Sequence, residues 1–300
     1  MNKSQFFAKA GLVALYFLCL NACVKQLPTN KSSKWPISSY NFGGMQEMSV
    51  AEQVSLLRLS GYDGLILRVA TPANFEMLPD FIAEVDKYDD FQIHAAFVRY
   101  NFEDTVMREQ WKEVVDQIAS RHIQLWVIFG KEVEGYDEVF IENKLREIND
   151  YALVRGVEVI LYPHSSTYYE SVEEALPMVK RVSSSNLHTA VHLYHEIRAG
   201  NGHRMHEVLE YSISKLGAVT LAGTDSVADY TSPLARDTST IKTIGCGSFD
   251  LKTFLATLHQ LKYDGFVGVM NFKISADPKV YLPESKNKLD DYMEEIQSKL

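Results

Sequence analysis

Short apolar segments alternate with amphipathic segments along most of the chain. The apolar run over 157–162 (VEVILY) is rich in β-branched residues, which is typical of a strand buried on both faces of a parallel sheet. The segment over 171–182 repeats its apolar residues with the helical period and opens with a capping-box pattern from Ser171 to Glu174. On this basis strands are predicted over 37–42, 65–69, 93–98, 125–129, 157–162, 188–193, 218–222 and 265–270, and helices over 49–59, 74–87, 109–119, 139–154, 171–182, 205–216 (closed by Gly217), 251–261 and 286–300.

This alternation of strands and helices predicts one (β/α)8 TIM barrel over residues 35–300. An open doubly wound sheet is the main alternative, but it usually carries a glycine-rich phosphate-binding turn after its first strand. The sequence has no such turn. The long segment over 223–247 is predicted to be a loop that lies over the catalytic face of the barrel.

The N-terminus has the layout of a secretory signal. Lys3 and Lys9 flank an apolar run over 10–20 that is too short to span a bilayer. The run ends in the sequence LNAC, which resembles a bacterial lipobox, so we expect residues 1–22 to be removed and Cys23 to be lipidated. An ordinary cleaved signal and an uncleaved anchor are the alternatives. Residues 23–34 would then be a lipidated cysteine and a flexible tether, and the protein would be a lipid-anchored protein of the cell envelope, periplasmic or in the outer membrane.

Composition narrows the range of partners. With 46% apolar residues, the chain can bury one large core. Its formal net charge is −9, and it contains no block of basic residues, so nucleic acid is not an expected partner. Loss of residues 1–22, which carry two lysines and no acid, would change that charge to −11. Only Cys246 would remain as a free thiol, which excludes an intramolecular disulfide.

Three segments carry a resemblance to a known family. GVEVILYPH (156–164), HLYH (192–195) and GCGSFDLKTFLATLHQLKYDGFVGV (245–269) resemble the sugar phosphate isomerase/epimerase group, also called xylose isomerase-like TIM barrels. The resemblance implies a barrel that acts on a sugar. In the family, a divalent metal is bound by Glu, Asp, His and Glu at the ends of strands five to eight. Here the matching positions hold Tyr162, His192, Thr220 and Met270, and only His195 matches the substrate-contacting histidine of the family's Asp-x-x-His motif.

Polar and aromatic residues follow the predicted strands, at the end where barrels of this kind place their chemistry. Histidine titrates near neutral pH, so we expect His164 or His195 to act as general base or acid, with Lys273 or Arg68 stabilising an enolate. Because polar and aromatic side chains bind sugars by hydrogen bonding and stacking, we expect substrate contacts from a second set. That set is Arg68, Tyr100, Tyr162, His192 and Asn271.

No metal cofactor is expected, because carboxylates are missing from the four family positions. Zinc bound by His164, His192 and His195 is the alternative. The favoured function is a sugar isomerase or epimerase-like lipoprotein that transfers a proton, with a lyase-type reaction also open. A non-catalytic carbohydrate-binding lipoprotein is the second possibility, and a barrel hydrolase with paired acids is the third. Export would favour a free sugar or glycoside over a sugar phosphate as the ligand.

Overall fold

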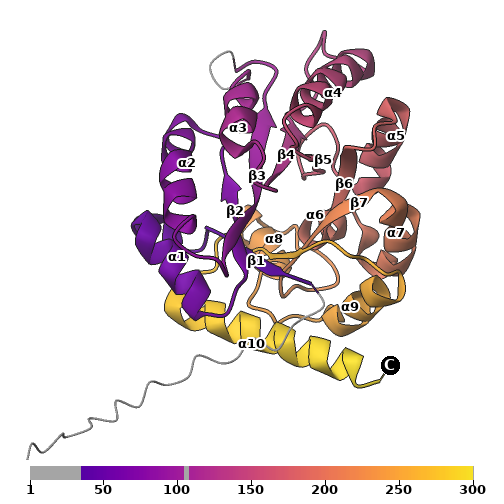
Figure 1. The fold of residues 1–300 in the computed structure, drawn as a ribbon. Coiled ribbons are helices and arrows are strands. Elements are labelled where there is room, and N and C mark those ends of the chain that lie inside the picture. The colour runs from indigo at the N-terminus through magenta and orange to yellow at the C-terminus, as the bar shows by residue number, and fades with distance from the viewer. Residues whose placement is uncertain (1–34, 105–107, 300) are drawn as a thin grey trace, which may run out of the picture.

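The computed structural model describes residues 35–104 and 108–299, so the predicted signal segment, Cys23 and the tether lie outside the described residues. Eight parallel strands form one closed barrel in chain order, and β8 pairs with β1 (Figure 1). The prediction of a (β/α)8 barrel is confirmed. The strands are β1 (Ile37–Tyr40), β2 (Gly64–Arg68), β3 (Gln92–Tyr100), β4 (Gln124–Phe129), β5 (Val159–Leu161), β6 (Leu187–His192), β7 (Leu216–Leu221) and β8 (Val267–Val269).

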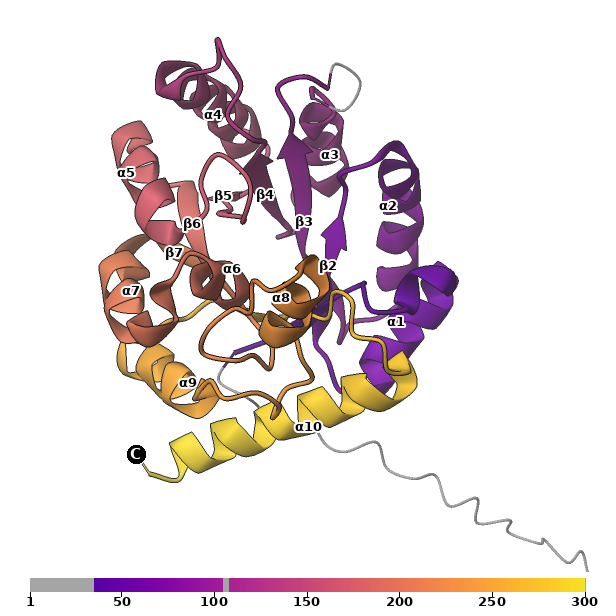
Figure 2. The same ribbon diagram turned by 180° about the vertical axis from the view of Figure 1, so that it is seen from behind.

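Most helices pack around the outside of the barrel, while α6 and α8 lie across its opening (Figure 2). Among the described residues, no helix combines the length and the apolar content needed to cross a membrane. The helices are α1 (Val50–Leu59), α2 (Pro72–Val85), α3 (Trp111–Ile118), α4 (Glu138–Leu153), α5 (Val172–Val182), α6 (Leu193–Arg198), α7 (Met205–Ser212), α8 (Pro233–Thr240), α9 (Leu251–Gln260) and α10 (Pro278–Gln297).

Successive strand residues point alternately to the helices and into the barrel, and this produces two separate apolar cores. The larger core lies between the strands and the outer helices, and Tyr100 belongs to it. The smaller core fills the barrel and is rich in aromatic residues, including Tyr40, Phe97, Trp126 and Tyr162. On β3, Phe97 faces inward, so the same alternation sends Arg99 inward and Tyr100 outward.

Several local predictions differ from the structure. The predicted strand over 188–193 ends at His192, and α6 begins directly at Leu193. The predicted loop over 223–247 contains α8, which Ser232 caps by accepting a hydrogen bond from the Ala235 amide. The final helix starts at Pro278, before the predicted start at 286, because Pro278 occupies the first helical turn, where proline is tolerated.

Gly217 was predicted to end a helix, but it lies within β7. A Cβ atom at this position would come within 2.6 Å of the Ile160 side chain and 2.8 Å of the His188 side chain. Gly217 is therefore needed for close packing between strands and does not act as a helix terminator.

Candidate functional site

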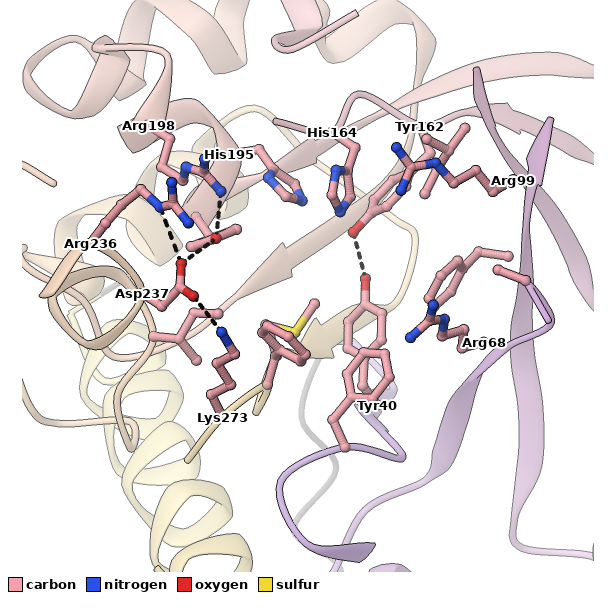
Figure 3. Close-up of a pocket in the computed structure, with 18 residues that line it drawn as sticks. Tyr40, Arg68, Arg99, Tyr162, His164, His195, Arg198, Arg236, Asp237 and Lys273 are labelled. Atoms are coloured by element: carbon pink, nitrogen blue, oxygen red, sulfur yellow. Dashed lines mark hydrogen bonds and ion pairs between the residues drawn. The ribbon is translucent and has the colours of Figure 1, made fainter. Parts of the chain in front are cut away.

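A cavity of about 340 Å³ opens at the carboxyl end of the strands (Figure 3). Its volume falls within the roughly 300–1,000 Å³ typical of small-molecule sites. Aromatic side chains form much of its wall, and charged side chains project into it from both sides. Of the site residues predicted from the sequence, Arg68, Tyr162, His164, His195 and Lys273 line this cavity.

Three histidine rings and one tyrosine ring come together at the base of the cavity. The ring centroids of His164 and His195 are 4.1 Å apart, and those of His192 and His195 are 4.3 Å apart. The Tyr162 ring lies 5.8–6.4 Å from all three. These residues come from β6, α6 and the loop after β5, so the short helix α6 brings His195 back over the strand ends.

Ser165 makes hydrogen bonds that fix the positions of the protons on two of these rings. Its backbone N–H donates to Nδ1 of His195 over 3.1 Å, so this nitrogen must carry the lone pair and Nε2 must carry the proton. Its carbonyl oxygen lies 2.8 Å from Nδ1 of His164, and a carbonyl only accepts, so Nδ1 of His164 carries the proton. Neutral His164 therefore exposes a basic Nε2, whereas neutral His195 exposes an Nε2–H donor.

Burial keeps all three imidazoles neutral at physiological pH. Desolvation, with smaller contributions from the positive charges of Arg99, Arg198 and Arg68, lowers the pKa of His164 to about 4. Desolvation and the neighbouring histidines also hold the pKa of His195 well below its ordinary value. His192 is 1% exposed, and burial likewise depresses its pKa strongly.

Tyr162 is held by a second buried phenol. The hydroxyl groups of Tyr40 and Tyr162 lie 2.8 Å apart and form a hydrogen bond below the histidines (Figure 3). Burial raises the pKa of both phenols far above the ordinary range, so both stay protonated. Tyr162 also stacks on Trp126, with ring centroids 4.9 Å apart, which fixes its orientation.

Asp237 organises the opposite side of the cavity. Lys273 donates to its carboxylate over 2.9 Å, Arg236 over 3.2 Å and the Tyr194 hydroxyl over 3.3 Å. Arg198 in turn donates to the Tyr194 oxygen over 2.6 Å. Burial by itself would raise the pKa of Asp237, but the bonds from Lys273 and Arg236 outweigh it and lower that pKa.

Three of the predicted substrate contacts do not line the cavity. Tyr100 faces the helices, where it packs on Phe102 and Phe129. Asn271 is fully buried and donates to the Tyr40 carbonyl over 3.0 Å, so it joins β1 to the chain after β8. His192 lies beneath His195 and Tyr162 and is covered by them.

The cavity also contains residues that were not assigned to the site from the sequence. Tyr194 and Arg198 are on α6, and Arg236 and Asp237 are on α8. Both helices were absent from the predicted secondary structure, which explains why these residues were missed. Arg99, which follows a predicted strand, also lines the cavity, because its alternation with Phe97 turns it into the barrel.

The residues at the family's metal positions do not fit a divalent cation. Among residues 35–104 and 108–299, no cluster of three or more His, Cys, Asp or Glu side chains is arranged to hold a metal ion. Hydrogen bonding at His195 also argues against zinc bound by the three histidines. Nδ1 of His195 accepts the Ser165 N–H, so Nε2 of His195 bears a proton and offers no lone pair to a metal.

A buried carboxylate anchors α6 and thereby positions His195. Glu196 accepts the backbone N–H of Val172 at the start of α5 over 2.7 Å, and it accepts the Asn201 side-chain amide over 2.7 Å. Its side chain is fully buried, and desolvation raises its pKa to about 7. The orientation of His195 therefore depends on a carboxylate that titrates near neutral pH.

The fold and the position of the cavity define a (β/α)8 barrel with its site at the carboxyl ends of the strands. Residues 54–292 match the family model described as xylose isomerase-like TIM barrel. The chain therefore belongs to this family. A comparison with curated proteins found no match.

Solved structures with the same fold include sugar epimerases. D-allulose 3-epimerase from Methylomonas sp. aligns with a TM-score of 0.65 at 14% identity, over 87% of this chain and 99% of its own. 3-Keto-D-glucoside 4-epimerase from E. coli aligns with a TM-score of 0.66 at 15% identity, over 86% and 99%. L-ribulose 3-epimerase aligns with a TM-score of 0.66 at 12% identity, over 88% and 96%. At these identities the likeness establishes the fold alone.

Proposed function

We propose that this protein catalyses an isomerase- or epimerase-type proton transfer on a sugar, with histidine chemistry in place of the family's metal. The observation that carries the proposal is the pairing of His164 and His195, whose rings are 4.1 Å apart and whose tautomers are opposite. A base and a hydrogen-bond donor side by side are what proton abstraction next to a carbonyl requires.

Each group has a defined role in the proposed step. Nε2 of His164 takes a proton from the carbon next to the sugar carbonyl, and the electron pair of that C–H bond moves to form an enolate. The Nε2–H of His195 donates a hydrogen bond to the enolate oxygen and stabilises its charge. For isomerisation, His164 then gives the proton to the former carbonyl carbon while the proton of the neighbouring hydroxyl passes to the enolate oxygen. For epimerisation, a proton instead returns to the opposite face of the original carbon. Neither route consumes an oxidant or a reductant.

The walls of the cavity support a sugar as the substrate. Tyr40, Phe97 and Phe272 provide apolar faces against which a sugar ring can stack. We assign the Tyr162 hydroxyl and Lys273 to substrate orientation, since both line the cavity and each is fixed by a hydrogen bond. The sugar epimerases that share the fold support the same class of substrate.

Hydrogen exchange in deuterium oxide tests the proposal. The wild-type protein is incubated with a panel of neutral and anionic aldoses and ketoses, and NMR records the loss of the proton next to the carbonyl. Because general acid–base groups contribute about 10²–10⁴-fold, His164→Gln and His195→Gln should each slow the exchange by at least about 10²-fold. His203→Gln, which alters an exposed histidine, is the matched control.

Two results would contradict the proposal. One is exchange at the wild-type rate in both variants, which would place the base elsewhere. The other is sugar binding with no exchange for any member of the panel, which would favour the non-catalytic carbohydrate-binding alternative.

We also propose that the protein is anchored to the cell envelope through lipid on Cys23. The support is the lysine-flanked apolar run followed by LNAC. In metabolic labelling with a fatty-acid analogue, wild-type protein should be labelled, and Cys23→Ala should not. Equal labelling of both would exclude Cys23 as the lipidation site.

A further inference from the structure

Positive charge dominates the cavity, although the protein as a whole is acidic. Four arginines and one lysine line it, but Asp237 is its only acidic lining residue in the described part of the chain. The formal net charge of the whole chain is −9. A concentration of cations inside a concave site raises the local concentration of anions.

Asp237 compensates the cations on one side of the cavity only. It pairs with Arg236 and Lys273, and its carboxylate also accepts the Tyr194 hydroxyl, to which Arg198 donates. In Figure 3 this group lies together on one side of His195. The local network leaves no carboxylate for the cations on the other side.

Arg68 and Arg99 occupy that other side, beyond Tyr162 and Tyr40 (Figure 3). They project from the neighbouring strands β2 and β3, and both are partly buried. Among the residues that the structure describes, neither is in an ion pair, and the buried Nε of Arg99 has no hydrogen-bond acceptor. Burial lowers the pKa of Arg99, and repulsion from Arg68 lowers it further.

Two adjacent guanidinium groups without a counter-ion form an energetically unfavourable pair that a bound anion would relieve. Guanidinium groups present planar, forked donors that match the oxygens of a carboxylate or phosphate. The neutral histidines lie between this pair and the Asp237 group, so a ligand held at Arg68 and Arg99 extends over His164.

We propose that the sugar ligand carries an anionic oxygen group, a carboxylate or a phosphate, bound by Arg68 and Arg99. The catalytic part of this inference depends on the proposed function, whereas the binding of an anion by Arg68 and Arg99 does not. A sugar carboxylate would agree with the expectation, drawn from export alone, of a free sugar or glycoside, whereas a sugar phosphate would not. The ring of the sugar lies against the aromatic wall, and its carbonyl end points to His164 and His195.

An anion at this position would also make His164 a better base. Arg99 and Arg68 are among the charges that depress the pKa of His164. Neutralising them with a bound anion removes their part of this depression, whereas desolvation, its largest cause, remains. Binding and catalysis would thus be coupled through the same two arginines.

Calorimetric titration with three probes tests the inference: glucose, glucuronate and glucose 6-phosphate. We expect at least one of the two anions to bind at least tenfold more tightly than glucose, and its affinity to fall between low salt and about 0.5 M salt. The preferred anion distinguishes a carboxylate from a phosphate. Arg68→Gln and Arg99→Gln should each weaken that binding at least tenfold, and Arg68→Lys should weaken it less than Arg68→Gln, because it keeps the charge but loses the fork.

Arg121→Gln is the matched control, because Arg121 pairs with Asp86 on the exposed surface before β4. Circular dichroism verifies that each variant is folded. Equal affinity for glucose and both anions, absence of binding by all three, or unchanged affinity in both glutamine variants would each overturn the inference. Tight anion binding without deuterium exchange would uphold it while contradicting the proposed reaction, so the two failures are distinguishable.

Discussion

The Glu196 carboxyl, which lies next to His195, should make the unfolding free energy depend on pH. Replacing Glu196 with glutamine should remove this dependence. The Glu196 carboxyl is fully buried and accepts hydrogen bonds from Val172 and Asn201. Desolvation, with a smaller contribution from Glu173 and Glu174, outweighs these two hydrogen bonds and raises its pKa from 4.5 to about 7. Glutamine preserves the size of the side chain and one acceptor oxygen, but it cannot ionise.

The sign and size of the effect follow from proton linkage. A carboxyl whose pKa is raised by folding contributes stability that is fully present below its unfolded value of 4.5 and is lost as pH rises through about 7. Each unit of pKa shift corresponds to about 1.4 kcal/mol, so ionisation of Glu196 should cost about 3 kcal/mol between these limits. Relative to wild type, the glutamine variant should therefore gain about 3 kcal/mol between pH 4.5 and pH 8.

Urea unfolding across this pH range measures the effect. The informative quantity is the difference in unfolding free energy between wild type and Glu196→Gln, because the contribution of the buried histidines is common to both and cancels. Glu76→Gln, which alters an exposed carboxyl on α2, is the control and should show a difference near zero at every pH. A wild-type-minus-variant difference that stays constant from pH 4.5 to pH 8, or that favours wild type as pH rises, would refute the reasoning.

Two further substitutions test the hydrogen bonds around the cavity. Asp237→Asn should lower the unfolding free energy by about 2 kcal/mol, since a side chain that is 5% exposed loses its charged bonds to Lys273 and Arg236. Urea unfolding measures this, and wild-type stability would show that the pairing contributes nothing. Tyr162→Phe should cost about 1 kcal/mol, because the buried Tyr40 hydroxyl loses its partner. The half-exposed Tyr211→Phe serves as its comparison, and an equal loss in both would exclude a specific contribution from the buried pair.

The sequence was sufficient to predict the barrel, because short apolar strand segments alternate regularly with segments whose apolar residues follow the helical period. The strand ends also brought Tyr162, His164, His192 and His195 together as expected, since parallel strands share one carboxyl edge. The strand alternation could have excluded Tyr100, because Phe97 faces into the barrel and a residue three positions later faces outward.

The residues of the site that lie on α6 and α8 could not be predicted from the pattern of apolar residues. Residues 193–198 are too few to show a helical pattern, so α6 was not predicted. The sequence over 233–240 has no clear apolar stripe, and α8 was therefore predicted as loop. Arg198 and Asp237 reach the cavity only through these two helices, so their roles follow from tertiary structure alone.

The opposite character of the two histidines is encoded in the main chain at position 165 rather than in a side chain. Alanine at this position would keep both the amide that donates to His195 and the carbonyl that accepts from His164, losing only the hydroxyl 2.9 Å from His195. Proline at this position would lack the backbone N–H that donates to Nδ1 of His195, so the tautomer of His195 would no longer be fixed. The acid–base polarity of the pair therefore depends on the backbone of a buried residue and would survive its replacement by alanine.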